Sequence, residues 1–175
     1  MAEFTKTNLG IVHRFDTRTK RHYMNGTQTV YHCHHYATLY TQLAIDAGEE
    51  ELMAQSSEDS FYPILCRMLE ENGAIELEDR VELARQYYAA IGLGALEVEF
   101  LGDDAAQIVS THSHLEQGWL KKWGVYDKPV NYIGCGYVSA MLAAVLGQNC
   151  RSFATFETTS IAMGASQTTF KSYKK

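Results

Sequence analysis

The sequence lacks the features that separate one domain from another. Only two of its 175 residues are proline, and no Pro-, Gly- or Ser-rich stretch, internal repeat or low-complexity segment interrupts it. Linkers between domains are usually built from such stretches. We therefore predict that residues 1–175 form one domain, because a chain of this length can bury a sizeable core.

Long apolar runs and blocks of positive charge are also missing. The longest apolar-rich run, residues 137–147, is far shorter than the ~20 residues that span a bilayer, and the first ten residues lack the apolar stretch of a signal peptide. The formal net charge is −6, and Lys and Arg cluster only in the terminal KSYKK. We expect a soluble, cytoplasmic protein that binds neither nucleic acid nor membrane.

The four cysteines indicate neither a disulfide framework nor a zinc ribbon. Cys33, Cys66, Cys135 and Cys150 are widely and irregularly spaced, and no CxxC pair occurs. A chain that can build a core of this size does not need disulfides to fold. Reduced thiols are therefore expected.

Hydrophobic periodicity predicts a mixture of strands and helices. Short strand-like pieces with an Asn25-Gly26 turn come first, and a hairpin of two strands around the turn at 102–104 comes later. A final segment rich in β-branched and aromatic residues covers 150–172. Helical spacing is found at 30–47, 50–55, 60–72, 79–91, 114–123 and 131–147.

The stretch TVYHCHHYATLY, residues 29–40, places His32, Cys33, His34 and His35 in consecutive positions. If a helix begins near residue 30, its free N–H groups and dipole lower the pKa of the Cys33 thiol, and a neighbouring imidazole can accept the proton. Cys33 is then a candidate nucleophile with the three histidines as its catalytic partners, and we expect it to face the interior of a pocket with one or two histidines at the mouth. Alternatively, Cys33 is a small residue on an apolar stripe and the histidines lie on other faces.

The histidines could instead bind a metal ion. His32 and His35, or His32 and Tyr36, would share one face of a helix, but one helix supplies two ligands at most. His112 and His114 could supply the others if both point to one side of a strand. A His-x-His pattern is equally typical of surface histidines, so both interpretations stay open.

Glu157 is a carboxylate inside a segment whose other residues predict a buried strand. A buried carboxylate is paired, bound to a metal or protonated, because an isolated charge is costly away from water. Glu157 is therefore a candidate site residue. The alternative is a residue at a strand end that faces water.

Residues 134–173 resemble the C-terminal half of the 4-vinyl reductase or hydrocarbon-binding domain family. In that family a helix of the type G-Y-x-x-G/A leads to a strand ending in Glu, followed by a Cys three residues later, an Ala-x-Gly turn and Cys-x-Phe. The matching residues in this chain are Gly136, Tyr137, Ala140, Glu157, Ala162, Gly164 and Phe170. The resemblance covers residues 131–172 well and the rest of the chain only loosely.

The resemblance implies an α/β (α+β) fold in which an antiparallel sheet packs against helices, as in trafficking-complex subunits of the TRAPP type. It also implies a pocket for a small hydrophobic or aromatic ligand, and a homodimer. The small residues Gly136, Ala140 and Ala144 form the stripe on which we expect two chains to pair. The expected ligand-binding residues are Tyr36, His112, His114, Trp119, Cys135 and Glu157.

The zinc pattern of the family is incomplete in this chain. Phenol-sensing regulators carry this domain with a zinc site, but Ser160 and Thr168 stand where the family has its two late cysteines. Only Cys135 and Glu157 remain of a four-ligand set, and hydroxyls do not replace thiolates as zinc ligands. We expect no structural zinc, and the sequence identifies no other cofactor.

Three functions stay open on the sequence alone. The resemblance favours a module that binds a small hydrophobic or aromatic molecule. The cluster at 32–35 instead suggests an enzyme of hydrolase or lyase type, with Cys33 as nucleophile or a histidine-bound metal as Lewis acid. A tetrapyrrole or haem carrier with His112 or His114 as axial ligand is the third, although no CxxCH motif supports it.

Overall fold

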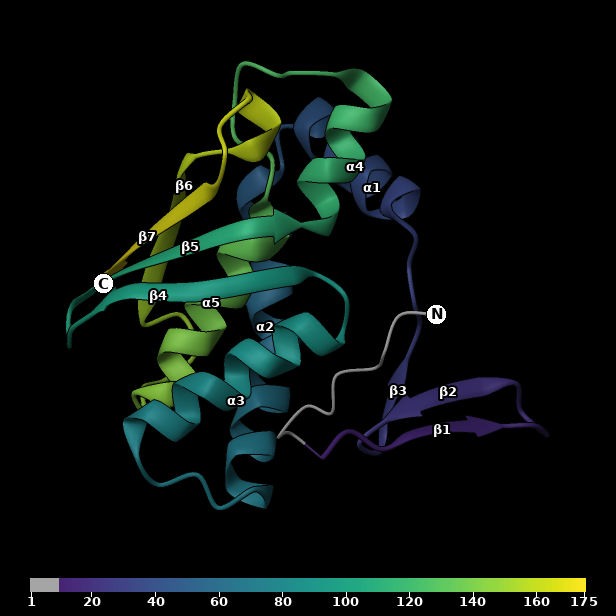
Figure 1. Ribbon diagram of the computed structural model, residues 1–175, viewed down its shortest axis with the longest axis vertical. Helices are drawn as coiled ribbons and strands as arrows, with labels where there is room; N and C mark the ends of the chain where they lie inside the picture. The colour runs from purple at the N-terminus through teal and green to yellow at the C-terminus, as the bar shows by residue number, and fades with distance from the viewer. Residues whose placement is uncertain (1–9) are drawn as a thin grey trace.

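The computed structural model describes residues 10–175 and contains two antiparallel sheets and five α-helices (Figure 1). The small sheet has the order β1-β2-β3 and the larger one the order β4-β5-β7-β6. The elements are β1 (His13–Asp16), β2 (Arg21–Met24), β3 (Thr27–Thr29), α1 (His34–Ala47), α2 (Glu50–Glu71), α3 (Leu77–Ala90), β4 (Gly94–Leu101), β5 (Ala105–Ser113), α4 (His114–Trp123), α5 (Tyr132–Val145), β6 (Phe153–Thr159), the 3-10 helix η1 (Ile161–Met163) and β7 (Thr168–Lys174).

The larger sheet packs against helices, as the resemblance implied. Helix α5 lies on one face of this sheet, with α2 beyond it (Figure 1). Nearly every residue of α5 is buried, so this helix forms the centre of the core. The expected α+β fold with an antiparallel sheet against helices is confirmed.

The stripe of small residues on α5 packs inside the chain. A Cβ atom at Gly136 would lie 2.1 Å from the carbonyl oxygen of Ala54 and 2.6 Å from Cβ of Ser57, both on α2. Ala140 and Ala144 are buried as well. The expectation that this stripe pairs two chains is therefore wrong, because α2 already covers it.

Two helices differ from the sequence-based prediction by more than two residues in their bounds. Helix α2 is continuous through Pro63, where two shorter helices were expected, because packing along α5 outweighs the ~3 kcal/mol that an interior proline costs. Helix α1 begins at His34 and not near residue 30, so Cys33 is its N-cap residue. The predicted ends at Gly48 and at Asn72-Gly73 are observed, and both glycines adopt the left-handed conformation.

The predicted hairpins are present. Asn25 and Gly26 both have positive φ and connect β2 to β3, as a type I′ turn requires. Strands β4 and β5 pair around the turn at 102–104, with Glu97 and Glu99 exposed and Leu96 buried. The small sheet β1–β3 stands apart from the larger sheet (Figure 1).

No helix within residues 10–175 is long and apolar enough to cross a membrane. The cytoplasmic location expected from the sequence stays a prediction.

The close contact between α2 and α5 can be tested by adding one methyl group at residue 136. We expect Gly136→Ala to lower the free energy of unfolding by ~2–3 kcal/mol, because the new methyl group would overlap the backbone of α2. Urea unfolding measures the change. Gly10→Ala is the matched control, since nothing lies within 4 Å of its new methyl group. Equal stability of both variants would contradict this packing.

Candidate functional site

A cavity of about 590 Å³ lies where β3, α1, α2, α4 and the loop between α3 and β4 meet. Its walls are mostly apolar, and Met53, Phe61, Ile64, Tyr87, Leu93 and Ile133 contribute to them. Its polar groups are the imidazoles of His32 and His114 together with hydroxyl and amide side chains. Among residues 10–175, no Asp, Glu, Lys or Arg lines it. A volume of this size accommodates a small organic molecule.

His114 is the polar group of this cavity that lacks a partner. It is the first residue of α4, and its backbone N–H donates to the carbonyl oxygen of Leu93 at 3.0 Å. Its ring nitrogen Nε2 is buried and has no hydrogen-bond partner. A buried polar atom without a partner costs ~1–3 kcal/mol.

The start of α1 brings a second histidine beside His114. The ring centroids of His34 and His114 are 5.9 Å apart, and those of His34 and His35 are 4.2 Å apart. Gly118 permits this approach, since a Cβ atom there would lie 2.6 Å from Cβ of His34. Partial desolvation, followed by the positive charges of His35, Lys121 and His114, lowers the pKa of His34.

Cys33 does not face the interior. As the N-cap of α1 it has an extended backbone, its side chain makes no cap hydrogen bond, and it is exposed. The expected orientation toward a pocket is wrong because the helix begins one residue after Cys33. His35 and Tyr36 are also exposed, so His32 is the residue of the 32–35 cluster that lines the cavity.

The four histidines considered as metal ligands are not brought together. Strand β5 ends at Ser113, so His114 belongs to α4 and does not share a strand face with the exposed His112. Of the four, only His32 and His114 line the same cavity. In the part of the chain that the structure describes, no three His, Cys, Asp or Glu side chains are close enough to hold one metal ion.

Trp119 lies in a smaller core cluster and does not line the cavity. Its ring packs against Trp123 at 4.5 Å and Tyr126 at 5.2 Å between centroids. It is almost fully buried, and its indole Nε1 has no hydrogen-bond partner. The position of Trp119 therefore supports the packing of α4 rather than contact with a ligand in this cavity.

Glu157 is buried, as its place in an apolar strand suggested. Its Oε2 accepts a hydrogen bond from the backbone N–H of Asn131 at 2.7 Å, whereas its Oε1 has no partner. Burial and then the negative charge of Glu116 raise the pKa of Glu157 to about 8. At neutral pH most of the Glu157 carboxyl groups are therefore protonated.

Glu116 is a buried carboxylate that is not among the site residues predicted from the sequence. The pattern Ser113-x-x-Glu116 is that of a capping box, in which the glutamate returns to the helix start at the surface. Only half of the box forms: Ser113 Oγ accepts from the backbone N–H of Glu116 at 3.3 Å, while the Glu116 side chain is completely buried. The capping pattern predicts an exposed glutamate, whereas packing against other parts of the chain buries the Glu116 side chain.

The residues at the family's zinc positions do not fit a zinc ion. The hydroxyls of Ser160 and Thr168 both donate to Glu116 Oε1, at 2.8 and 2.5 Å. Burial, and then the charge of Glu157, raise the pKa of the Cys135 thiol far above its ordinary value. Two hydroxyls that already bind a carboxylate, a neutral thiol and a largely protonated carboxyl group make a poor donor set for zinc.

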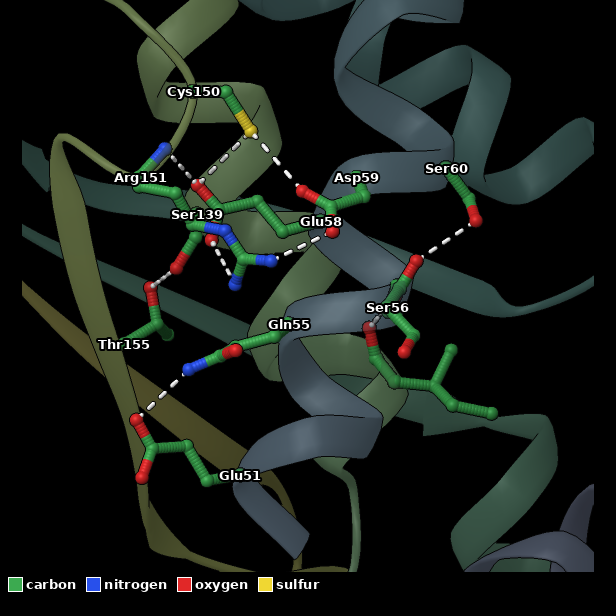
Figure 2. A network of polar contacts seen from close by, with 12 residues as sticks. Glu51, Gln55, Ser56, Glu58, Asp59, Ser60, Ser139, Cys150, Arg151 and Thr155 are labelled. Carbon is green, nitrogen blue, oxygen red and sulfur yellow. Dashed lines mark hydrogen bonds and ion pairs between the residues drawn. The ribbon is translucent and has the colours of Figure 1, made fainter.

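A second cavity, of about 380 Å³, lies between α2, α5 and β6. Beside it the buried Glu58 accepts a hydrogen bond from the backbone N–H of Arg151 at 2.6 Å, and the guanidinium of Arg151 donates to Asp59 at 2.7 Å (Figure 2). Ser139 and Thr155 join α5 to β6 by a hydroxyl contact of 2.8 Å (Figure 2). Arg151 is thus paired with Glu58 and Asp59 within the chain. These contacts hold α2 against the loop before β6.

Comparisons with known proteins identify the fold but no sequence relative. No family model and no curated protein matches the sequence. The phenol-responsive sensory domain of the transcription activator PoxR, solved with phenol, is similar in structure with a TM-score of 0.75 and 13% identity over 93% of this chain and 84% of that one. A trafficking protein particle complex subunit 3 from Naegleria fowleri, covalently bound to palmitic acid, matches with a TM-score of 0.54 and 16% identity over 80% of this chain and 90% of that one. The chain therefore has the fold of these two proteins.

The raised pKa of Glu157 makes stability depend on pH. Below pH 4.5 both the folded and the unfolded chain carry the proton, whereas between about 4.5 and 8 only the folded chain holds it. We therefore expect the free energy of unfolding to fall as the pH rises through this window. Glu157→Gln is neutral at every pH, so the fall should be ~2–4 kcal/mol smaller in this variant.

Urea unfolding at pH 5, 6.5 and 8 measures this difference. Other titrating groups contribute equally to wild type and variant, so they cancel in the comparison. Glu97→Gln is the control, because Glu97 is an exposed carboxylate on β4. Parallel pH profiles for wild type and Glu157→Gln would show that Glu157 is not protonated in the folded chain.

Proposed function

We propose that residues 1–175 form one domain of the 4-vinyl reductase or hydrocarbon-binding type that binds a small, largely apolar molecule in the cavity of about 590 Å³. The observation that carries the proposal is the mostly apolar wall of this cavity, at which the imidazoles of His32 and His114 are among the few polar groups. A ligand that fills the cavity and forms a hydrogen bond with one of these imidazoles gains both apolar burial and a hydrogen bond. The phenol bound in the structurally similar sensory domain of PoxR supports this class of ligand.

The side chains that line the cavity favour one class of ligand. Phe61, Tyr40 and Tyr87 offer aromatic surface, and His32 and His114 offer ring nitrogens that donate or accept. No carboxylate of the described residues lines the cavity to balance an ammonium group. No described lysine or arginine lines it to balance a carboxylate either, so the proposed ligand is a neutral aromatic molecule with one hydroxyl group.

No observation favours catalysis over binding. Cys33, the hypothetical nucleophile, is exposed and does not line the cavity, and the four histidines of the metal hypothesis are dispersed. The haem-carrier hypothesis has no support beyond the presence of His114 in the cavity. The apolar wall and the imidazoles of the cavity support ligand binding, and neither feature indicates a chemical reaction.

Calorimetric titration with matched compounds tests the proposal. We expect phenol derivatives to bind and the corresponding benzylamines and benzoates not to bind. His114→Phe keeps the ring volume but removes the hydrogen bond, so it should weaken binding about 10- to 100-fold. His112→Phe is the control, since His112 is exposed on β5. The proposal fails if no compound binds at millimolar concentration, or if both variants bind as wild type does.

We also propose the homodimer that the resemblance implies, with a different contact from the one expected. Helix α1 exposes an apolar face made of Tyr36, Leu39, Tyr40 and Leu43. Asp46 is the single charged residue of α1, so two copies related by a twofold axis can pair these faces without burying an unpaired charge.

Sedimentation at micromolar concentration tests the dimer. The wild-type chain should sediment as a dimer, and Leu43→Glu should give a monomer, because a charge buried between two apolar faces is costly. Leu52→Glu is the control, since Leu52 is an equally exposed leucine on α2. A monomeric wild type would remove the proposal, and a dimeric Leu43→Glu would place the contact elsewhere.

A further inference from the structure

We propose that the carboxylate of Glu116 takes the place of the family's zinc ion in this chain, and that Glu116 is a positioning residue that holds His114 at the cavity. The second half of this inference rests on the proposed function. The replacement of zinc by Glu116 does not rest on it, and melting and zinc-binding experiments test that replacement separately from ligand affinity.

Glu116 joins three parts of the chain to α4. Its Oε1 accepts hydrogen bonds from the hydroxyls of Ser160 and Thr168, which flank η1, and from the backbone N–H of Ala162 at 3.4 Å. Its Oε2 accepts from the side-chain amide of Asn131, the N-cap of α5, at 2.9 Å. Three donors therefore contact Oε1 and one contacts Oε2, so both oxygens of this buried carboxylate have hydrogen-bond partners.

This arrangement reverses the charges of a zinc site. A zinc ion is a central cation held by thiolate and carboxylate groups, whereas here a central anion is held by O–H and N–H donors. The hydroxyls of Ser160 and Thr168 fit the arrangement around a central anion, because each donates a hydrogen bond to Glu116. Thiolates at the same two positions would repel the carboxylate. The presence of Ser160 and Thr168 where the family has cysteine thus has a physical reason in Glu116.

The same network fixes the start of α4. Ser113, the N-cap of α4, accepts hydrogen bonds from the Glu116 backbone N–H at 3.3 Å and from the Asn131 amide at 3.2 Å. His114 lies between Ser113 and Glu116 in the first turn. Both ends of this turn are therefore held by buried hydrogen bonds, and His114 is carried to the cavity by a rigid segment.

The first experiment compares melting temperatures of the full chain with and without a strong zinc chelator. We expect the wild type to be unaffected by chelation and Glu116→Gln to melt at least 5 °C lower, because an amide cannot accept all four hydrogen bonds. Glu97→Gln should melt as wild type does. If Glu116→Gln does not fold, Ser160→Ala and Thr168→Val, which each remove one donor, should each lower the melting temperature by a smaller amount.

The second experiment restores the zinc site. In the triple variant Glu116→Ala, Ser160→Cys, Thr168→Cys, the introduced thiols join Cys135 and Glu157 to give a four-ligand set. We expect zinc chloride to raise the melting temperature of this variant, or to fold it, and to leave the wild type unchanged. No response of the triple variant would show that these four positions do not converge on one centre. A wild type that contains one zinc per chain and melts earlier on chelation would overturn the proposal outright.

The third experiment tests the positioning role through ligand affinity. Calorimetry with phenol should show several-fold weaker binding to Ser160→Ala than to wild type, and no further weakening when Ser160→Ala is added to His114→Phe. A purely structural role would weaken binding equally in both backgrounds. If the proposed function fails, no variant binds phenol, whereas the melting and zinc results still decide the role of Glu116.

Discussion

The structure depends on the close approach of α5 to its neighbours. This helix lies between the larger sheet and α2, and Gly136 permits the backbone of α2 to come within contact distance. Small residues along α5 are therefore required by the interior of one chain. Helix α2 stays helical through Pro63 along this contact, and its residues Met53, Phe61 and Ile64 form part of the wall of the cavity.

Two kinds of buried polar group serve different ends in this fold. Around Glu116 and Asn131 nearly every buried donor and acceptor has a partner, as the cost of burying charge demands. At the start of α4, by contrast, the buried Nε2 of His114 has none. A satisfied network makes a segment rigid. Glu116 and His114 lie on the same turn of α4, so the network holds the segment that carries His114.

The sequence drew attention to some of the buried polar residues and not to others. Glu157 was identified because a carboxylate in an apolar strand has few acceptable environments, and His114 because histidine pairs are chemically conspicuous. Glu116 was missed, since Ser113 and Glu116 form a capping pattern that normally describes a surface helix start. Cys33 was given too much weight, because adjacency to histidines in the chain does not bring side chains together when the helix begins one residue later.

The sequence by itself determined the order and type of most elements and the turns at Asn25-Gly26 and Gly48. These features depend on local conformational preference and on the spacing of apolar residues, which are properties of neighbouring positions. Only the tertiary structure decided which histidines line the cavity, which partner the small residues of α5 have, and which group the hydroxyls of Ser160 and Thr168 bind. Those answers depend on contacts between residues far apart in the chain, such as Glu116 with Ser160 and Thr168, and no local pattern encodes them.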